Sequence, residues 1–589
     1  MKPQPVKYSD QLIDWLVELG YTHCFFVAGG NIMHLLDSAR TRLKCVAVVH
    51  EVAAGIAAEY FNQVTENGKA FAMVTAGPGL TNIVTAIGGA WLENRDLLVV
   101  GGQVKSADLM TSGLRQRGIQ EIDGVSITES ITKRSIRLCE PVDEWSIKST
   151  VMTGLTPRQG PVFIEVCLDV QGAPPIQSQQ QLLVDTEEPS QDIPSFVAQI
   201  VDILNESERP TILIGAGVSR KVAWRHRKLL ESLKLPLLTT WHGADRLSSR
   251  ADNYFGRPET WGQRLANMIV NQADVLLVLG ARLGYQETGF NWQEFAKNAR
   301  IIHVDIDEPE LHKGHPNVHL KVHGDADYVL SGILAGELPE RPDWLSYCKD
   351  MRELLPLNEL ANETGPEFIS PYEFYRGASE LSDEDDVWVP ASSGGANSVA
   401  IQALQQWGSQ KVVCDNGLAS MGYGLSGAIG AAFAAPDKRV WLVEGDGGFT
   451  QNLQELATVA VNHLNIKIFI FSNEGYGSIR TTQKNYFNGD YLGCDTNTGL
   501  GFPSWRVLAD AYGIPYGIFT DAGFNDPQIR GVLSRTGPVL IEVPIDPLQT
   551  YWPKIMSRVT ESGSMESNPL YRMSPDLSED IWTKVSRYL

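Results

Sequence analysis

Two side chains that could bind a metal, Asp446 and Asn473, each follow an apolar segment where a predicted strand ends. Residues 440–443 lead into Asp446, which lies between two glycines, and residues 466–471 lead through Ser472 into Asn473. Apolar residues at helical spacing fill the segment between them, so the sequence predicts a strand, a helix and a second strand. Open α/β sheets bind ligands at the carboxyl ends of such strands. Oxygen donors at that edge suit Mg²⁺, and the glycines and helix start favour a diphosphate.

An acidic residue in the amino-terminal third, Glu51, follows the predicted strand 45–49 and begins an alanine-rich helix. Taken alone, an acid in the first turn of a helix is most often a favourable partner of the helix dipole. The chemistry open to a buried carboxyl group at this place is hydrogen bonding and proton sharing with a ligand.

The composition limits the function classes. A length of 589 residues exceeds one hydrophobic core and predicts three or four domains. The net charge of −21 argues against nucleic acid and anionic membrane as partners. No segment reads as a membrane span and the amino terminus lacks an apolar signal core, so we expect a cytoplasmic protein. The seven cysteines form no CxxC pair, so neither a zinc site nor a disulfide framework is indicated.

Strand and helix patterns alternate along three blocks, so we predict an α/β protein with three doubly wound parallel-sheet domains. The blocks cover residues 5–172, 195–335 and 368–545, with polar connectors at 171–194 and 337–366. The tail, residues 546–589, either folds over a site as a lid or extends along the surface. The clearest predicted elements are a helix at 8–19 and strands at 24–27, 45–49, 70–74, 97–100, 162–166, 211–214, 275–279, 301–304, 440–443, 466–471 and 539–543.

The Gly-Asp-Gly at Asp446, with Asn473 after the next strand, resembles the signature of thiamine diphosphate enzymes. Residues 48–55 resemble the HEQ-type stretch of these enzymes, and residues 75–82, Thr-Ala-Gly-Pro-Gly-Leu-Thr-Asn, resemble their TSGPGATN loop. From residue 5 to residue 545 the chain is similar to the acetolactate synthase family. The resemblance implies a pyrimidine-binding domain, a central FAD- or transhydrogenase-like domain and a diphosphate-binding domain, in that order.

The resemblance also implies a role for individual residues. The Mg²⁺ ligands are Asp446, Asn473 and the carbonyl of Gly475, and Glu51 hydrogen-bonds the aminopyrimidine of thiamine diphosphate. Met421 supports the bent coenzyme, whereas the family's Gln-His pair is absent at 394–396. The implied cofactor-binding residues are Gly29, Pro78, Asn82, Gly394, Gly395, Ala396, Ser420, Met421, Gly445, Asp446, Gly447, Gly448, Asn473, Gly475, Tyr476, Gly477, Ser478 and Ile479.

Three polar residues match family positions near the reacting carbon, namely Gln103, Gln120 and Lys133. They occur in the segments Gly-Gln-Val, Ile-Gln-Glu and Ile-Thr-Lys-Arg. Each also has the plain alternative of a solvated polar residue. Gln103 is the strongest of the three candidates because it directly follows a predicted buried strand.

The central block resembles the FAD-binding domain of acetolactate synthases. A lone Gly-x-Gly after a strand is usually only a tight turn. Some family members keep this domain without a flavin, so FAD is implied as a third cofactor with a structural rather than a redox role. The matching residues are Gly215, Ala216, Gly217, Arg282, Asp305 and Asp325.

Two positions depart from the family pattern in the acceptor pocket. The arginine that pairs with a second 2-oxo acid is replaced by Gln286, and a bulky aromatic residue is replaced by Thr482. An amide cannot form the charge-assisted pair that a guanidinium forms with a carboxylate. We therefore expect pyruvate as the donor and a neutral ketone, aldehyde or keto-sugar as the acceptor.

The predicted activity is a decarboxylating carboligase with two alternatives. One is a simple 2-oxo acid decarboxylase, which is disfavoured because the sequence contains no adjacent His-His pair. The other is a non-catalytic cofactor-binding subunit, which Glu51, Asp446 and Asn473 argue against. In the family, Glu51 of one subunit faces Asp446 of another, so the resemblance implies a homodimer or homotetramer.

Overall fold

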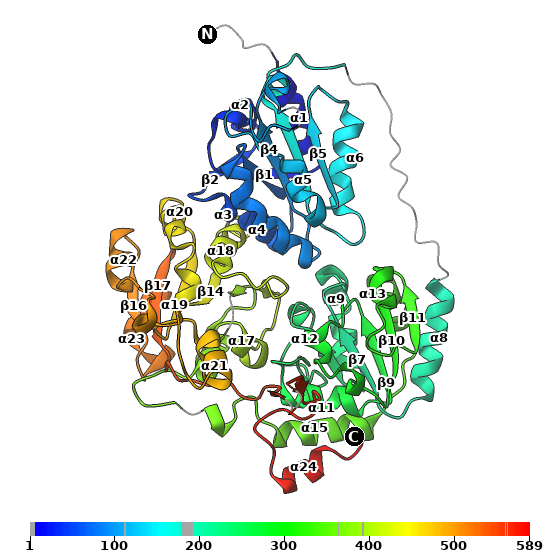
Figure 1. The fold of residues 1–589 in the computed structure, drawn as a ribbon. Helices are drawn as coiled ribbons and strands as arrows, with labels where there is room; N and C mark the ends of the chain where they lie inside the picture. The colour runs from blue at the N-terminus through cyan, green and yellow to red at the C-terminus, as the bar shows by residue number, and fades with distance from the viewer. Residues whose placement is uncertain are drawn as a thin grey trace.

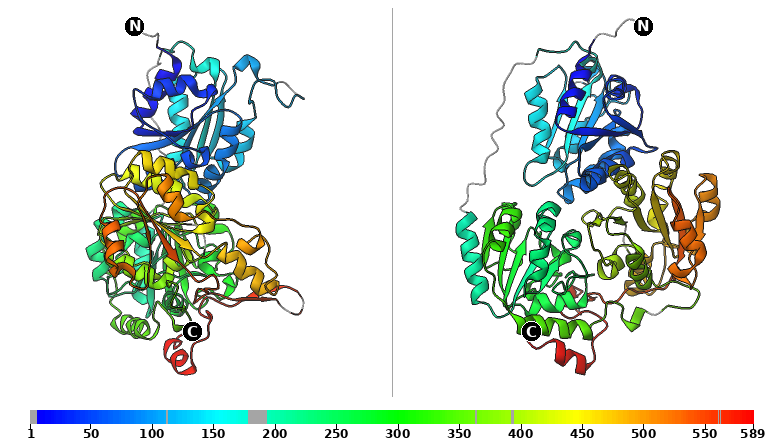
Figure 2. Two further views of the ribbon diagram at one scale, coloured as in Figure 1. Left: turned by 90° about the vertical axis from the view of Figure 1, so that its left-hand side faces the viewer. Right: turned by 180° about the vertical axis from the view of Figure 1, so that it is seen from behind.

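The computed structural model describes residues 6–110, 113–177, 193–362, 364–391, 394–559, 561 and 563–589 (Figure 1). It contains three large parallel sheets, each built from one continuous part of the chain and covered by helices. The predicted α/β fold class with three parallel sheets is therefore confirmed. The amino-terminal domain lies above the other two domains, which lie side by side (Figure 2). No helix among the described residues has the length and apolarity needed to cross a membrane.

The amino-terminal sheet has the strand order β2-β1-β3-β4-β6-β5, and all its neighbouring strands are parallel. Its central strands are apolar runs buried on both faces, as expected for a parallel sheet. The strands are β1 (Tyr21–Phe26), β2 (Lys44–Ala47), β3 (Lys69–Val74), β4 (Leu98–Gln103), β5 (Arg134–Leu138) and β6 (Val162–Cys167). The helices are α1 (Tyr8–Glu18), α2 (Met33–Ala39), α3 (Glu51–Val64), α4 (Pro78–Leu92), α5 (Gly124–Thr128), α6 (Glu144–Leu155) and α7 (Leu168–Gln171).

The central sheet has the order β11-β10-β9-β7-β8 and is also parallel throughout. The strands are β7 (Pro210–Ile214), β8 (Leu237–Thr239), β9 (Val275–Leu279), β10 (Arg300–Asp305) and β11 (Leu320–His323). The helices are α8 (Ile193–Glu206), α9 (Arg220–Arg225), α10 (Arg227–Ser232), α11 (Arg264–Gln272), α12 (Tyr285–Thr288), α13 (Glu308–His312) and α14 (Ala326–Leu334), followed by α15 (Pro342–Leu354) in the connector.

The carboxy-terminal sheet has the order β13-β12-β14-β15-β17-β16, again parallel. The strands are β12 (Val387–Pro390), β13 (Lys411–Val412), β14 (Val440–Gly445), β15 (Ile466–Ser472), β16 (Tyr516–Ile518) and β17 (Val539–Pro544). The helices are α16 (Pro371–Leu381), α17 (Ser398–Ala403), α18 (Tyr423–Ala434), α19 (Asp446–Phe449), α20 (Leu456–Val461), α21 (Gly477–Tyr486), α22 (Trp505–Ala511) and α23 (Pro527–Leu533). The single helix predicted between β14 and β15 is instead a series of short helical pieces.

The tail carries β18 (Ser557–Val559), β19 (Met565–Ser567) and α24 (Glu579–Val585), and it packs under the central domain (Figure 2). Leu570 and Val585 are buried in the core of that domain. Gln272 Nε2 donates to the Val585 carbonyl at 2.8 Å, and Arg264 Nη1 donates to the Met573 carbonyl at 2.8 Å. These contacts dock the distal part of the tail on the central domain, and whether the tail also covers a site stays a prediction.

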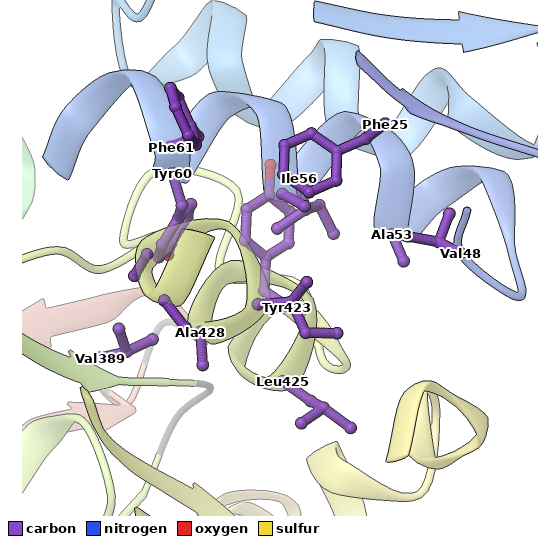
Figure 3. Close-up of a cluster of buried hydrophobic side chains, with 14 of the residues drawn as sticks. Phe25, Val48, Ala53, Ile56, Tyr60, Phe61, Val389, Tyr423, Leu425 and Ala428 are labelled. Atoms are coloured by element: carbon purple, nitrogen blue, oxygen red, sulfur yellow. The ribbon is translucent and has the colours of Figure 1, made fainter. Parts of the chain in front are cut away.

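The amino- and carboxy-terminal domains of one chain meet where α3 packs along α18 (Figure 3). Two glycines on α18 allow the close approach. A Cβ added to Gly430 would lie 2.0 Å from the Ala57 carbonyl oxygen, and one added to Gly427 would lie 2.6 Å from the Tyr60 ring. The two domains therefore share one hydrophobic core, to which both helices contribute.

Candidate functional site

The carboxyl edge of the carboxy-terminal sheet holds Asp446, which begins α19 directly after β14. The side chain is buried, and its two oxygens accept the backbone N–H groups of Gly447 at 2.7 Å and Asn473 at 2.9 Å. Burial raises the pKa of Asp446 to about 6, although these hydrogen bonds act in the opposite direction. A carboxylate at the ends of β14 and β15 is thus fixed in place by both neighbouring strand ends.

Asn473 and Gly475 complete a set of three oxygens with Asp446. The amide atom that Asn473 turns toward them lies 3.3 Å from Asp446 Oδ1 and 2.7 Å from the Gly475 carbonyl oxygen. With the amide oxygen at that position, three oxygens face each other without a hydrogen between them. Octahedral Mg²⁺ holds adjacent oxygen ligands about 3 Å apart, given Mg–O distances of about 2.1 Å. The predicted ligand set therefore fits Mg²⁺ in both chemistry and spacing.

The glycines around this edge leave room for a bulky anion. Gly394 has a φ of +67°, and a Cβ there would lie 3.3 Å from Ser478 Oγ at the start of α21. A Cβ on Gly395 would lie 2.9 Å from the Tyr551 hydroxyl, and one on Gly447 would lie 2.3 Å from the Tyr476 ring. The loop after β12, the loop after β14 and the start of α21 thus converge beside the three oxygens. That arrangement suits a metal-bound diphosphate.

Ser420 and Met421 lie on a loop of the same domain, and the Asp415 side chain holds this loop in place. The Asp415 carboxylate accepts the backbone N–H groups of Leu418 at 3.2 Å and Ser420 at 3.1 Å. The Met421 side chain is 37% exposed in this chain. Gln451 Nε2 contacts the Met421 sulfur at 3.6 Å, which links this loop to the segment after Asp446.

Glu51 lies at the carboxyl edge of the amino-terminal sheet, where β2 leads into α3. Its carboxylate is nearly buried and accepts a 2.9 Å hydrogen bond from Asn82 Nδ2 on α4. Pro78 begins that helix, and a Cβ on the preceding Gly77 would lie 2.5 Å from the Gln120 carbonyl oxygen. Glu51, Asn82, Pro78 and Gln120 therefore gather at one edge.

Gly29 belongs to the same edge, because it packs directly on the loop after β3. A Cβ there would lie 2.4 Å from the Thr75 Cβ. Thr75 Oγ1 is buried and has no hydrogen-bond partner among the described residues. The loop of residues 75–82 thus presents a free polar atom close to the residues that the resemblance assigns to the coenzyme.

Two of the predicted catalytic residues, Gln103 and Lys133, make hydrogen bonds to other groups of the amino-terminal domain. Gln103 is fully buried, and its amide donates to the Ile122 carbonyl at 2.8 Å and to Glu165 at 3.0 Å while accepting from Val104 N. Lys133 precedes β5 and therefore lies at the amino edge of the sheet, opposite Glu51. Its Nζ donates to Thr156 and to the Arg158 carbonyl. The amino-edge position of Lys133 argues against its predicted role near a reacting carbon, whereas Gln103 ends β4 at the carboxyl edge that also holds Glu51, so its role stays a prediction.

A cavity of about 660 Å³ lies where the three domains meet, at the carboxyl edge of the central sheet. Of the predicted FAD residues, five line it, namely Ala216, Gly217, Arg282, Asp305 and Asp325. Gly215 lies beneath them, since a Cβ there would lie 2.1 Å from the Gly280 carbonyl oxygen. The volume is within the range of cofactor pockets, and arginines on the wall suit phosphates while the carboxylates suit ribose hydroxyls.

The same cavity residues also make contacts within the protein. Asp325 caps α14 through the Asp327 N–H, and Arg282 donates to the Leu92 carbonyl of the amino-terminal domain. Burial raises the pKa of Asp305 to about 6. The residues present therefore fit FAD, and part of the cavity wall comes from each domain.

Gln286 reaches across a domain boundary to Asn416. Asn416 Nδ2 donates to Gln286 Oε1 at 2.8 Å, and Gln286 also lines the cavity. Thr482 is exposed on α21 and donates to the Ser478 carbonyl. Gln286 and Thr482 make no hydrogen bond to each other in the described parts of the chain, and their shared role in an acceptor pocket stays a prediction.

Glu259 is a buried acid that no sequence pattern indicated as a functional residue. It is 3% exposed, and its carboxyl group has no hydrogen-bond or ion-pair partner within the ranges that the structure describes. The adjacent Thr260 N–H donates to the Gln286 carbonyl at 2.8 Å. Burial, assisted by the charge of Glu287, raises the pKa of Glu259 to about 8. Glu259 therefore holds a proton at neutral pH in the folded protein.

Glu259→Gln is expected to change how stability depends on pH. The folded-state pKa of Glu259 lies above its unfolded value, so the folded protein holds an extra proton between about pH 5 and pH 8. In the wild type this group makes stability fall with rising pH, by at most about 1.4 kcal/mol per pH unit. Denaturant titrations at pH 5.5, 6.5 and 7.5 should show that the free energy of unfolding of the variant, relative to that of the wild type, increases as pH rises. Parallel pH profiles would contradict the assignment, and Glu129→Gln is the surface control.

In this single chain no hydrogen bond or ion pair joins Glu51 to Asp446, both of which are described residues. The two predicted halves of the site occupy the carboxyl edges of different sheets, one in the amino-terminal and one in the carboxy-terminal domain. Among the residues that the structure covers, no cluster of three or more His, Cys, Asp or Glu side chains could hold a metal. The mixed oxygen set at Asp446 is thus the candidate metal site.

Three family models match successive parts of the chain. They are described as thiamine pyrophosphate enzyme N-terminal TPP binding domain, central domain and C-terminal TPP binding domain, and they match residues 6–127, 197–333 and 393–543. The acetolactate synthase isozyme 1 large subunit of Escherichia coli (strain K12) is 29% identical over 553 residues, which cover 93% of this chain and 95% of that protein. The acetolactate synthase large subunit of Corynebacterium glutamicum is 28% identical, with 97% and 91% covered. That of Cyanidium caldarium is 29% identical, with 92% and 94% covered.

Proposed function

Since the chain belongs to the thiamine diphosphate-dependent enzymes of the acetolactate synthase family, we propose that it decarboxylates pyruvate and transfers the two-carbon unit to a neutral carbonyl acceptor. The observation that supports this most directly is that one atom of the Asn473 amide lies within 3.3 Å of Asp446 Oδ1 and 2.7 Å of the Gly475 carbonyl oxygen. When bound, thiamine diphosphate supplies the electron sink that a 2-oxo acid needs to lose CO₂. The residues of the chain bind and orient it.

Each group of residues has a separate task. Asp446, Asn473 and Gly475 hold Mg²⁺, which offsets the charge of the diphosphate, and the glycine loop after β12 leaves room for it. Glu51, oriented by Asn82, holds a proton against the far nitrogen of the aminopyrimidine. Met421 would support the bound coenzyme. The cavity between the domains would hold FAD through Ala216, Gly217, Arg282, Asp305 and Asp325, and the flavin would there stabilise the arrangement of the domains.

A complete site needs a second copy of the chain. Glu51 and Asp446 lie on different sheets and make no direct contact in one chain, and apolar side chains near both are exposed. Ile119, beside Gln120, is 85% exposed, and Ile479 at the start of α21 is 47% exposed. A homodimer or homotetramer in which Glu51 of one copy faces Asp446 of another would cover them. Small-molecule substrates then enter between copies.

Carbon dioxide release tests the reaction class. With Mg²⁺ and thiamine diphosphate, release from pyruvate should be slow alone and stimulated by aldehydes, ketones or keto-sugars, with mass spectrometry identifying the coupled product. Steady aldehyde formation without stimulation would instead indicate the alternative 2-oxo acid decarboxylase. Absence of any turnover would indicate a cofactor-binding subunit.

The acceptor is proposed to be neutral because of the groups around Gln286. Its amide is bonded to Asn416, and burial raises the pKa of the nearby Glu259 despite the opposing charges of His242 and Arg257. Hydroxyl and carbonyl groups are good partners for amides and for a protonated carboxyl group. An anionic second 2-oxo acid finds no guanidinium at this position.

Gln286→Arg is expected to increase acetolactate formation from pyruvate alone by about tenfold or more, because a charge-assisted pair contributes about 1.5–3 kcal/mol. The measurement is steady-state acetolactate production over a range of pyruvate concentrations. Gln159→Arg adds the same charge elsewhere on the cavity wall and serves as the control. Efficient acetolactate formation by the wild type, with a low acceptor KM, would contradict the neutral-acceptor proposal.

A further inference from the structure

Glu455 is a fully buried carboxylate that the proposed mechanism has not used. It ends the short 3₁₀ helix Leu453–Glu455, in the connection that begins at Asp446 and leads to β15. Burial raises its pKa, while hydrogen bonds from Thr458, Val49 and His50 act in the opposite direction. A buried carboxyl group is retained only where such partners compensate for its desolvation.

The partners of Glu455 come from the turn directly before Glu51. Glu455 Oε1 accepts the backbone N–H groups of Val49 at 3.1 Å and His50 at 2.9 Å, and Oε2 accepts the Thr458 hydroxyl at 2.7 Å. The Val49 side chain is 50% exposed, so packing of that side chain does not anchor the turn. Val48, one residue earlier, is buried in the core and its N–H donates to the Phe26 carbonyl at 3.0 Å, so the carboxylate holds the next two backbone N–H groups, those of Val49 and His50.

His50 transmits this constraint to the helix that carries Glu51. Its ring Nδ1 accepts the Val52 N–H at 3.2 Å and so caps the start of α3, and its carbonyl accepts the Ala53 N–H at 3.0 Å. The Glu455 carboxylate thus holds the N–H of His50 from the carboxy-terminal domain, while Asn82 orients the Glu51 carboxylate from within the amino-terminal domain. A shift of about 1 Å in such a group can lower turnover about 100-fold.

The other end of the same segment meets the metal and coenzyme loops. Short turns link Asp446 to Glu455, with Thr450 N donating to the Asp446 carbonyl and Glu455 N donating to the Asn452 carbonyl. Asn452 Nδ2 donates to the Gly422 carbonyl at 2.8 Å, next to Met421. Residues 446–455 thus contain the Mg²⁺ ligand Asp446, contact the loop of Met421 and bind the turn that precedes Glu51.

We infer that Glu455 is a positioning residue for Glu51, and that it links the coenzyme site of its own chain to the acid serving the site of the second copy. This inference rests on the proposed function, in which Glu51 of one copy faces Asp446 of another. Within one chain, Glu455 bridges two residues that belong to two different active sites. Each site of the oligomer is thereby mechanically connected to the next.

The first test uses the protein without coenzyme. Backbone amide hydrogen exchange of the peptide covering Val49 and His50 should become at least about tenfold faster in Glu455→Ala, because both N–H groups lose their acceptor. Glu455→Gln should stay close to the wild type, since its amide oxygen can still accept these bonds while its nitrogen donates to Thr458. Gln454→Ala, one residue away on the same 3₁₀ helix, is the matched control. Unchanged exchange in Glu455→Ala would overturn the positioning role.

The loaded enzyme provides the second readout. Glu455→Ala is expected to lower kcat about 100-fold, while its affinity for Mg²⁺ and thiamine diphosphate stays within about threefold of the wild type. Glu455→Gln should recover most of the lost turnover. A loss of coenzyme affinity as large as the loss of kcat would assign Glu455 to the coenzyme site of its own chain and overturn the inference.

Mixed oligomers decide which site Glu455 serves. When Glu51→Gln chains are paired with Asp446→Ala chains, the one intact site combines Glu51 of the second chain with Asp446 of the first. Glu455→Ala placed in the chain that supplies Glu51 should remove that activity, whereas the same change in the other chain should not. The reverse pattern would overturn the cross-site link. Mixed oligomers without any activity would instead refute the shared site, while the exchange experiment would still report on positioning.

Discussion

Asp446→Ala should fail to retain Mg²⁺ and thiamine diphosphate, with an apparent affinity for the pair at least about 100-fold weaker than that of the wild type. Removing this carboxylate takes away the one charged ligand of the three-oxygen set and leaves Asn473 and Gly475 as neutral donors. Hard divalent cations depend on such charge, and even groups outside the ligand shell alter affinity by about 10–100-fold. Titration calorimetry with both ligands present measures the change.

The failure of Asp446→Ala to bind must be separated from misfolding. Asp446→Asn keeps the shape of the side chain and removes its ionisation. Because the folded-state pKa of Asp446, about 6, lies above the ordinary value, the ligand-free wild type loses stability as pH rises from about 4 to 6. Asp446→Asn avoids that ionisation but loses one backbone hydrogen bond, because its amide nitrogen cannot accept the N–H that the second carboxylate oxygen accepts. The ligand-free variant should therefore stay folded at pH 7, which circular dichroism checks, yet still bind weakly. Wild-type affinity in either variant would refute the metal assignment, and Asp437→Ala on the surface is the control.

Glu51→Gln should fold, bind Mg²⁺ and thiamine diphosphate within about threefold of the wild type, and lose about 10²- to 10⁴-fold in turnover. The amide oxygen of glutamine can still accept the hydrogen bond from Asn82, so the local geometry is retained. What the variant lacks is a carboxyl group that shares a proton with the coenzyme. The measurements are kcat for CO₂ release with the best acceptor and the affinity for the coenzyme.

Glu129→Gln, an exposed acid of the same domain, is the control for this prediction. A Glu51→Gln enzyme with near wild-type kcat would show that the acid lies elsewhere. Loss of coenzyme binding together with turnover would instead assign Glu51 a binding role.

Most of the strands that sequence patterns located are buried on both faces, with the edge strand β2 as an exception. Residues 275–279 were predicted to form a strand and do so as β9, and the apolar runs of β14, β15 and β17 were located within one or two residues at each end. The strands that were missed mostly lie at sheet edges, namely β5, β8, β11, β13 and β16. Edge strands here are short or partly exposed, so they lack the long apolar run that marks a central strand.

The site residues divide in a similar way. A strand followed by a polar residue indicated Asp446, Asn473 and Glu51, because the chain direction alone puts such residues at the carboxyl edge. Lys133 matched a family segment, but its edge depends on the direction of β5, which had no sequence signal. Glu259 and Glu455 act through burial and through contacts between distant segments, and neither property can be read from one acidic residue in a sequence.

The helical segment after Asp446 shows a conflict between local and tertiary preference. Its apolar spacing predicted one helix, but the structure has the short pieces α19 and α20 with a 3₁₀ turn between them. Gly447 and Gly448 weaken the first piece. The interruption lets Glu455 reach the turn before Glu51, so tertiary contacts outweigh the local helical pattern.

The bare glycine contacts between α3 and α18 determine where the molecule can flex. Gly430 lies against the peptide backbone of Ala57, and large buried side chains such as Tyr60 pack beside this contact. The first and last domains of a chain should consequently move as one solid body. The middle domain is tied to the last by buried contacts, since Trp241 packs in the core of the last domain and Arg257 donates to the carbonyls of Ile401 and Leu404. Its contacts with the first domain include polar links such as His242 to Glu93, which can exchange for water. Breathing that admits or releases a bulky product is then expected along the seam between the first and middle domains.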